Sequence, residues 1–327
     1  MKAVLVRQPG GAENLVLGEF PDPEPGPGEL LVRVRATALN RADILQRRGL
    51  YPPPPGASPL LGLEAAGEVV ALGEGCEGWQ VGDRVFALLP GGGYAQYVTV
   101  PATMALPIPP NLTFEEAAAI PEAFLTAYQT LFWIGRLEAG EWVLIHAGAS
   151  GVGTAAIQLA RDAGARVAVT AGTEPKLEAC RTLGAEVAIN YKLGPFAPAV
   201  REAAGERGVD LILDFVGAPY WEQNLDCLAV DGRLVLIATM GGGVLDRFDL
   251  RRIMAKRLQV TGTTLRSRSP AYKAQLTREF AVRVLPKLAS GRIRPVIDRV
   301  FPWDQVREAH RYMERNLNIG KIVLRVD

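Results

Sequence analysis

The segment from Trp142 to Gly153 restricts the possible fold more than any other part of the chain. Its first residues, Trp142–His146, form a short apolar run that ends in glycines, which predicts a buried parallel strand. Apolar residues then recur at helical spacing from Val152 to Ala163. A strand, a glycine turn and a helix in this order form the first half of a dinucleotide-binding unit, in which backbone N–H groups hold a pyrophosphate at the helix N-terminus.

The glycine turn differs from the usual G-x-G-x-x-G pattern at one position. Gly148, Ser150 and Gly153 occupy the three glycine places, so the middle glycine is replaced by serine. The G-x-S-x-G spacing of a hydrolase nucleophile elbow is not matched, and we interpret Ser150 as a phosphate donor. The predicted pyrophosphate site is the whole turn: Gly148, Ala149, Ser150, Gly151, Val152 and Gly153.

The residues after the second predicted strand, Arg166–Ala171, favour one of the two nicotinamide dinucleotides. An NAD site places an acid here to bind the ribose, whereas this chain has Ala171 and Gly172, followed by Thr173 and Lys176. A 2′-phosphate needs space, hydrogen-bond donors and positive charge, so the sequence predicts NADP. The alternative for Lys176 is a solvated charge at the start of a helix.

Length and charge limit the classes of protein to consider. A chain of 327 residues is expected to form two domains, and 48% hydrophobic with 22% charged residues is an ordinary globular composition. The net charge of +1 gives no reason to expect nucleic-acid or membrane binding. The sequence begins directly with a strand pattern, without a cleavable signal. Cys76, Cys180 and Cys227 are odd in number and far apart, which indicates reduced, buried thiols and a cytoplasmic location.

The region before Pro101 is rich in short strand patterns separated by glycine and proline. Two proline-rich segments, Pro21–Pro27 and Tyr51–Pro55, are expected to be loops. A helix over Phe114–Trp133, broken at Pro121, leads into the next domain. The expected strands, which we interpret as a small, partly open β-barrel, are Ala3–Val6, Leu30–Val34, Glu68–Leu72, Asp83–Ala87 and Ala95–Val100.

Strands and helices alternate from Trp142 to about Gly262, which predicts a doubly wound parallel sheet. After this point the pattern changes to helices over Ala271–Ser290 and Asp304–Arg315 and a closing strand, Lys321–Val326. We expect this tail to return to the first domain. The predicted α/β fold therefore has a discontinuous β-rich domain at 1–123 and 263–327 and a dinucleotide-binding domain at 124–262. The later parallel strands are expected at Glu186–Asn190, Asp210–Phe215, Arg233–Ala238 and Leu258–Thr263.

Several segments resemble the zinc-free quinone oxidoreductase branch of the medium-chain dehydrogenase/reductase superfamily, above all the stress-induced NADPH quinone oxidoreductases of animals. The resemblance runs nearly end to end and implies a GroES-like catalytic domain, a Rossmann domain for NADP and a homodimer formed through sheet edges. The segments that carry it are Ala38–Asp43, Gly49–Pro54, Leu61–Gly67, Gly82–Val85, Leu88–Gly93, His146–Gln158, Asn190–Lys192, Met240–Gly243 and Asn318–Val323.

The sequence departs from the zinc-dependent members of the superfamily. These carry Gly-His-Glu where this chain has Gly62-Leu63-Glu64, and leucine cannot bind zinc. The only histidines are His146, interpreted as a structural strand-end residue, and His310, interpreted as a helix-surface residue. We therefore predict no metal, and a structural rather than catalytic role for Glu64.

The resemblance also assigns the remaining site residues. Asn40 and Tyr51 are the proposed catalytic residues; Asn40 would hold the nicotinamide ribose or the substrate oxygen, and Tyr51 would stack on the substrate, donate its hydroxyl or merely anchor its loop. Arg266 is either at the substrate pocket or a solvated charge, Asp43 is structural, and Tyr191 either frames the 2′-phosphate or is an ordinary strand-end aromatic. The remaining predicted cofactor-binding residues are Thr126, Met240, Gly241, Gly242, Leu265 and Asn318.

The expected function is NADPH-dependent reduction of small quinones by hydride transfer, without metal. The cofactor supplies the chemistry, and the protein supplies orientation and a dry pocket. Two alternatives remain open: an NADPH-dependent alkenal or enone reductase, and an NADPH-binding redox sensor with little turnover.

Overall fold

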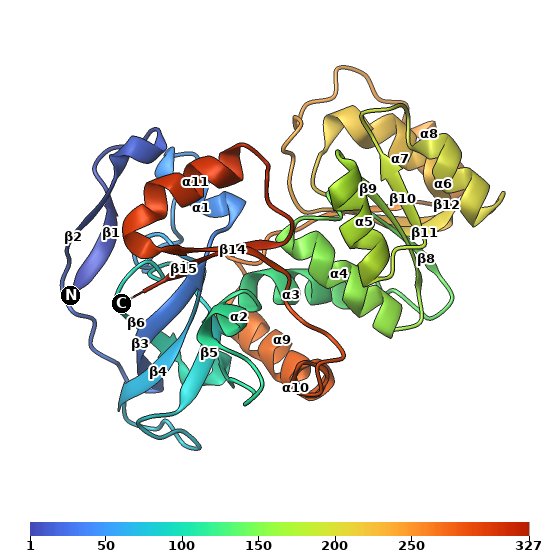
Figure 1. Cartoon of the computed structure of the whole chain (residues 1–327). Helices are drawn as coiled ribbons and strands as arrows, with labels where there is room; N and C mark the ends of the chain where they lie inside the picture. The colour runs from blue at the N-terminus through green and yellow to red at the C-terminus, as the bar shows by residue number, and fades with distance from the viewer. Residues whose placement is uncertain (327) are drawn as a thin grey trace. The chain divides into compact units, whose positions relative to one another are not determined.

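The computed structural model describes residues 1–326 and divides the chain into two compact units (Figure 1). The first unit comprises Met1–Leu125 and Leu265–Asp327, and the second comprises Thr126–Thr264. The C-terminal tail therefore belongs to the first unit.

The first unit is built on a seven-stranded sheet with the order β14-β15-β3-β4-β5-β7, and β6 pairs with β3 beside this path. Along β3, the side chains of Leu30, Val32, Val34 and Ala36 are buried while Arg33 is exposed, because alternate residues of a strand point to opposite faces. A separate hairpin pairs β1 with β2. The strands are β1 (Lys2–Val6), β2 (Leu15–Glu19), β3 (Glu29–Ala38), β4 (Glu64–Leu72), β5 (Arg84–Leu88), β6 (Tyr97–Pro101), β7 (Ala105–Pro107), β14 (Ile297–Pro302) and β15 (Lys321–Arg325).

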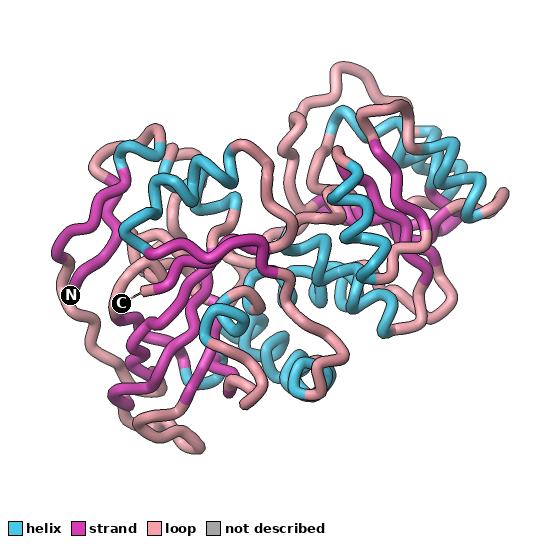
Figure 2. Tube along the Cα trace, in the orientation of Figure 1, coloured by secondary structure: helices cyan, strands magenta, loops and turns pink. Residues whose placement is uncertain are grey.

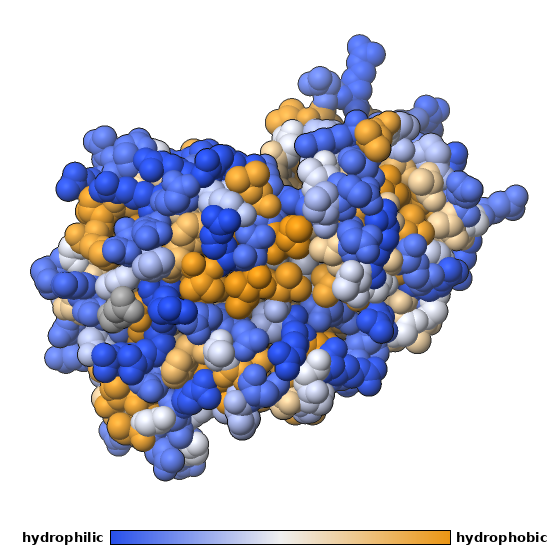
Figure 3. Space-filling model, in the orientation of Figure 1, coloured by the Kyte–Doolittle hydropathy of each residue, from blue (hydrophilic) through white to orange (hydrophobic). Residues whose placement is uncertain are grey.

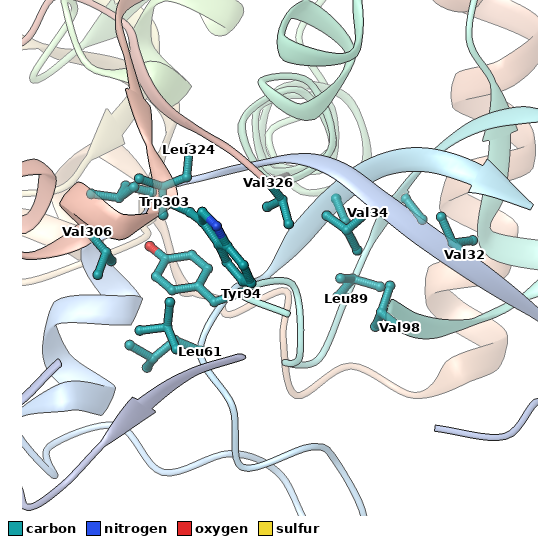
Figure 4. Packing of buried hydrophobic residues seen from close by; sticks show 14 of the residues in the cluster. Val32, Val34, Leu61, Leu89, Tyr94, Val98, Trp303, Val306, Leu324 and Val326 are labelled. Atoms are coloured by element: carbon teal, nitrogen blue, oxygen red, sulfur yellow. The ribbon is translucent and has the colours of Figure 1, made fainter. Parts of the chain in front are cut away.

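The C-terminal strands join this sheet directly. β15 lies antiparallel to β3 and parallel to β14, which the red and blue strands of Figure 1 show. The core beneath the sheet includes Tyr94, Trp303 and Leu324, and Figure 4 shows the rings of Tyr94 and Trp303 close together. The helices of this unit are α1 (Arg41–Arg47), α2 (Phe114–Ala118), α9 (Pro270–Arg283), α10 (Leu285–Ala289) and α11 (Val306–Glu314), with short 3-10 turns η1 (Ala12–Asn14), η2 (Ala102–Met104) and η5 (Trp303–Gln305).

The second unit is a doubly wound parallel sheet with the order β10-β9-β8-β11-β12-β13, whose strands appear in magenta in Figure 2. The order reverses between β8 and β11, and ligands of such sheets bind at the carboxyl ends of the strands at this point. The strands are β8 (Trp142–Ile145), β9 (Arg166–Ala171), β10 (Val187–Asn190), β11 (Val209–Asp214), β12 (Leu228–Leu236) and β13 (Gln259–Gly262). The helices are α4 (Gly151–Asp162), α5 (Glu174–Leu183), α6 (Ala197–Ala204), α7 (Trp221–Cys227), α8 (Arg251–Lys256) and the 3-10 turn η4 (Ala218–Tyr220).

One helical segment spans the boundary between the units. The predicted helix over Phe114–Trp133 is α2, then α3 (Pro121–Tyr128), then a π-helical stretch, η3 (Gln129–Ile134). The break falls at Pro121 as predicted, because proline cannot donate the backbone hydrogen bond that an uninterrupted helix requires.

These observations confirm the predicted α/β fold class, while several element boundaries differ. The sequence analysis missed β2, β7 and β14, and β12 begins at Leu228 rather than near Arg233. The long C-terminal helix is divided into α9 and α10 just before Pro286. Short strands carry too few residues to show a period, so only their pairing partners reveal them.

The surface in Figure 3 is mainly hydrophilic, with apolar areas interrupted by charged residues. Among residues 1–326, no helix is long and apolar enough to cross a membrane. All three cysteines are free; Cys180 and Cys227 are buried as predicted. Cys76 is only partly buried, and its Sγ lies 3.2 Å from the carbonyl oxygen of Glu29.

Candidate functional site

The predicted site residues fall into two groups, one in each unit. The first unit contains Asn40, Tyr51, Leu265 and Asn318, and the second contains the glycine turn and all other predicted cofactor-binding residues.

Asn40 links the end of β3 to the start of α1 and is held by two side chains. Its Nδ2 donates to Glu64 Oε1 at 2.8 Å, and its Oδ1 accepts from Lys321 Nζ at 2.7 Å. Its backbone N–H donates to Asp43 Oδ2 at 2.8 Å, which stabilises the first turn of α1. Asn40 is therefore fixed in one orientation before any ligand binds.

Glu64 and Lys321 form a buried ion pair beside Asn40. Lys321 Nζ lies 2.7 Å from Glu64 Oε1 and also donates to the Leu39 carbonyl at 2.9 Å, so with Asn40 each of its three N–H groups has an acceptor. The second oxygen, Glu64 Oε2, accepts from the backbone N–H of Glu122 at 2.8 Å. This agrees with the structural role predicted for Glu64, but the sequence analysis did not identify Lys321 or Glu122 as members of the site.

Asp43 is a buried structural residue. Its Oδ1 accepts from the Gly62 N–H at 3.0 Å, and its Oδ2 from Asn40 and, at 3.4 Å, from the Tyr94 hydroxyl. Burial raises the pKa of Asp43 to about 6, against the lowering effect of these two backbone donors. Asp43 thus joins the loop of Gly62 to the start of α1.

The prediction that His310 lies on a helix surface is wrong. Its ring is fully buried, with Nδ1 3.2 Å from Arg47 Nη1 and Nε2 3.3 Å from the Tyr94 hydroxyl. Burial, with the Arg47 charge, lowers the pKa of His310 to about 3, so the ring is neutral. Arg47 itself is fully buried and pairs with Glu314, a contact between α1 and α11 that sequence periodicity does not reveal.

Arg266 is buried rather than a solvated charge. Its Nε donates to the Pro90 carbonyl at 2.8 Å and its Nη2 to Gln46 Oε1 at 2.7 Å, while Nη1 has no partner among residues 1–326. The guanidinium carbon lies 5.2 Å from the centre of the Tyr51 ring, within cation–π range. Arg266 and Tyr51 therefore form a single polar group with one unused donor.

The other two predicted residues of this unit do not join these contacts. Leu265 is buried. Asn318 lies before β15, where its Nδ2 donates to the Gly320 carbonyl at 2.7 Å.

In the second unit, the glycine turn has the geometry of a phosphate-binding turn. A Cβ at Gly153 would lie 2.5 Å from the carbonyl oxygens of Ala147 and Gly148, and a Cβ at Gly148 would lie 2.7 Å from Val169 Cβ. Ser150 caps α4 by accepting from the Gly153 N–H at 3.0 Å, which leaves its own hydroxyl hydrogen available to a ligand. The turn fits a pyrophosphate at the N-terminus of the twelve-residue helix α4.

The residues predicted to recognise the 2′-phosphate gather at the ends of β9 and β10, where Asn190 pairs with Ala171. A Cβ at Gly172 would lie 2.8 Å from the Tyr191 hydroxyl and 3.1 Å from Lys192 Cε, so both side chains lie against Gly172. Thr173 precedes α5, which holds Lys176 in its first turn. Lys192 is a cation that the sequence analysis did not assign, although it follows Tyr191 directly.

The loop after β12 lies at the carboxyl end of that strand, against the residues that follow β11. Met240 and Gly241 donate their N–H groups to the Phe215 and Val216 carbonyls, and Gly242 bridges to Gly217. The Met240 side chain is 55% exposed, which leaves it accessible to a ligand. Thr126 is buried in α3, with its carbonyl accepting from the Thr130 hydroxyl.

His146 is structural, as predicted. Its Nδ1 is 2.9 Å from the Thr170 hydroxyl and its Nε2 is 2.7 Å from Asn224 Oδ1. Because an amide oxygen only accepts, Nε2 carries the ring hydrogen. Burial lowers the pKa of His146, which keeps it neutral.

Among residues 1–326, no group of three or more His, Cys, Asp or Glu side chains is arranged to hold a metal ion. The absence of a catalytic metal remains a prediction, based on Leu63 in place of the zinc-binding histidine.

Comparison with known proteins identifies the family. The family "Alcohol dehydrogenase GroES-like domain" matches residues 26–110, and "Zinc-binding dehydrogenase" matches residues 151–281. The chain belongs to the medium-chain dehydrogenase/reductase superfamily, in the branch that includes quinone oxidoreductases, VAT-1 proteins and enoyl reductases. It is thus an NAD(P)-dependent oxidoreductase with a GroES-like and a Rossmann-type unit.

Individual relatives are similar along nearly the whole chain. The human synaptic vesicle membrane protein VAT-1 homolog is 33% identical over 96% of this chain and 84% of its own length. The quinone oxidoreductase of Pseudomonas syringae pv. tomato has a TM-score of 0.88 at 30% identity, covering 99% of both chains. The mycobacterial protein Rv1454c, solved in complex with NADPH, has a TM-score of 0.88 at 32% identity, also covering 99% of both chains.

Proposed function

We propose that this protein is an NADPH-dependent quinone reductase that works without a metal ion. The observation that carries the proposal is the Arg266–Tyr51 group, in which a guanidinium lies 5.2 Å from the centre of an aromatic ring. A quinone presents what such a group binds: a carbonyl oxygen that gains negative charge, attached to a flat conjugated ring. The resemblance to stress-induced quinone oxidoreductases and the P. syringae relative support the same substrate class.

NADP is the proposed cofactor form. The end of β9 carries Ala171 where an NAD site would carry an acid, while Tyr191 and Lys192 lie against Gly172 and Lys176 adds a second cation in the first turn of α5. The relative solved with NADPH agrees with this choice. When bound, the nicotinamide supplies a hydride.

The residues of the first unit would orient the substrate rather than react covalently. Asn40 is locked by Glu64 and Lys321, so its amide presents a fixed polar edge to the ribose or the substrate. Preorganised donors stabilise developing oxygen charge without reorganising during the reaction. Hydride addition to a quinone gives a hydroquinone monoanion, which is a stabilised phenolate and suits catalysis by positioning.

The test is nicotinamide oxidation by the purified protein in the presence of a chelator. NADPH and NADH are each combined with ortho-quinones, para-quinones and enones. We expect chelator-resistant turnover of a quinone with NADPH. Loss of activity on chelation would contradict the metal-free assignment, and tight NADPH binding without turnover of any acceptor would favour the redox-sensor alternative.

A specific observation keeps enone reduction as the second candidate. Reduction of an activated C=C bond needs a proton at the neighbouring carbon, and the first unit holds a carboxyl, Glu122, whose pKa is raised to about 8. A higher kcat/KM for enones than for every quinone in the panel would favour this second function.

A homodimer formed through a sheet edge is the proposed assembly. β13 ends the six-stranded sheet, and the segment before it exposes Val244 at 82%, Leu250 at 67% and Met254 at 73%. Such exposed apolar side chains near an open strand edge are typical of an interface. Light scattering should show a dimer that Leu250→Glu with Met254→Glu converts to a monomer. Leu193→Glu, at a residue 85% exposed beyond β10, is the control that should leave the dimer intact.

A further inference from the structure

Three carboxyl groups of the first unit, Asp43, Glu64 and Glu122, influence one another electrostatically but have very different partners. Asp43 accepts from two backbone N–H groups. Glu64 accepts from Lys321, Asn40 and the Glu122 backbone N–H. The Glu122 carboxyl receives no hydrogen bond or ion pair from any residue in the described range 1–326.

The position of Glu122 is fixed although its carboxyl is unpaired. It lies in the first turn of α3, directly after Pro121, and its backbone N–H is bound to Glu64 Oε2 at 2.8 Å. Lys321 forms its ion pair with Glu64, and its three N–H groups all have other acceptors. Lys321 therefore makes no direct contact with the carboxyl of Glu122. Of the three carboxyl groups, Glu122 therefore has the fewest partners that could stabilise a negative charge.

Burial and the neighbouring Glu64 charge raise the pKa of Glu122 from 4.5 to about 8. Asp43 also raises it, while Lys321 and Arg266 lower it; Tyr51 and Lys273 are the other ionisable groups that interact with Glu122. Two neighbouring acids whose environments separate their pKa values divide the roles of proton donor and charged partner. Here Glu64 is the acid paired with Lys321, and Glu122, which has no such partner, keeps its proton at neutral pH.

Glu122 is also the group of this cluster that a substrate can reach. Arg266 Nη1 is sealed from solvent without a partner, whereas Glu122 is only partly buried and its oxygens are not among the sealed atoms. Both Glu122 and Arg266 interact with Tyr51, the predicted substrate-stacking residue. An acid, a cation and an aromatic ring are thus gathered in one part of the first unit.

We propose that Glu122 is the proton donor of the reductase, a catalytic residue that delivers its carboxyl proton to the substrate. This inference rests on the proposed function and identifies the residue that would supply the proton for the reaction. The acceptor gains a hydride, that is two electrons and one proton, from the reduced nicotinamide, which becomes oxidised. The O–H bond of Glu122 breaks, and its proton forms a new O–H bond on the phenolate oxygen of a reduced quinone or a new C–H bond on the α-carbon of an enolate. The resulting carboxylate recovers its proton from solvent.

The experiment compares wild type, Glu122→Gln and Glu122→Asp over a range of pH. Glutamine keeps the size of the side chain but cannot donate an acid proton, whereas aspartate can. We expect wild-type kcat to be constant below about pH 8 and to fall above it, because only the protonated acid reacts. Glu122→Gln should lose about 100-fold in kcat, the usual contribution of a general acid, and should lose the fall above pH 8.

The controls separate this role from a structural one. Glu122→Asp should restore at least a tenth of the wild-type kcat together with a pH-dependent limb. NADPH affinity, measured by fluorescence, should be unchanged in Glu122→Gln, since the residue is assigned to the substrate and not to the cofactor. Glu77→Gln, at an exposed carboxyl on the loop between β4 and β5, should match wild type throughout.

Infrared spectroscopy of the protein without cofactor or substrate gives a second readout. Wild type should show a protonated carboxyl band that disappears with a midpoint near pH 8 and is missing in Glu122→Gln. A Glu122→Gln enzyme with wild-type kcat and the same pH limb would overturn the proposal. Absence of turnover by wild type on every quinone and enone would instead overturn the proposed function, while the infrared band would still report the proton on Glu122.

Discussion

The two units of this protein build their candidate sites from different kinds of polar group. The second unit builds its phosphate turn from glycines, backbone N–H groups and one serine hydroxyl, and its buried histidine is neutral. The first unit places charged side chains at its site, where Lys321 pairs with Glu64 and donates a hydrogen bond to Asn40. It also buries the guanidinium groups of Arg47 and Arg266. Neutral backbone sites tolerate changes of pH, whereas buried charges and acids respond to them.

This difference divides the work of a hydride-transfer enzyme. The phosphate turn would bind the pyrophosphate of the cofactor, whose charge does not change during the reaction, so fixed dipoles suffice. The other unit meets a substrate whose charge changes during the reaction, and charged side chains with altered pKa values can respond to that change.

Lys321→Met should have the largest effect, on the first unit. Methionine has a similar length but no charge, so the buried Glu64 would lose its cation. Breaking one side of a buried ion pair costs about 3–5 kcal/mol. Urea unfolding should show this loss, and the double variant Lys321→Met with Glu64→Gln should recover a large part of it. Equal instability of the single and double variants would contradict the charge-pair explanation.

Gly153→Ala should have the next largest effect, on cofactor binding by the second unit. The added Cβ would lie 2.5 Å from two carbonyl oxygens of the turn, so the turn must shift. We expect NADPH affinity to fall by about 100-fold, or roughly 2.7 kcal/mol. Isothermal titration should detect this, with Gly194→Ala as control because nothing lies within 4 Å of a Cβ there. Unchanged affinity in Gly153→Ala would show that the turn does not hold the cofactor.

The same contrast explains what the sequence revealed and what it did not. The glycine turn and the end of β9 are local patterns, since Gly148 to Gly153 are adjacent in the chain and β9 begins soon afterwards. The Glu64–Lys321 pair joins residues 257 positions apart, and they meet because β15 and β4 both pair with β3. His310 was assigned to the surface for the same reason, because its partners Arg47 and Tyr94 lie on distant elements.

Glu122 gives the pH test of the comparison. Its folded pKa of about 8 lies above the ordinary value of 4.5, so between these two values only the folded state holds the proton. The stability of wild type should therefore fall as pH rises from about 5 to 8. Relative to Glu122→Gln, which cannot titrate, we expect a loss of about 2 kcal/mol, reduced from the full linkage value because the carboxyl keeps some contact with solvent. Parallel stability curves for the two proteins would show that Glu122 ionises normally.

Lys192→Ala should have the smallest effect, and this effect should be limited to the preference for NADPH over NADH. Lys192 Cε lies close to Gly172, beside the Tyr191 hydroxyl, where the 2′-phosphate is proposed to bind. Removing one exposed cation from a phosphate site costs about 1.4 kcal/mol, so NADPH affinity should fall about tenfold while NADH affinity stays constant. The loss should also shrink in high salt, because exposed charges are screened. Lys176→Ala is the matched comparison: if it changes the NADPH-to-NADH ratio and Lys192→Ala does not, the first turn of α5 rather than the end of β10 carries the preference for NADP.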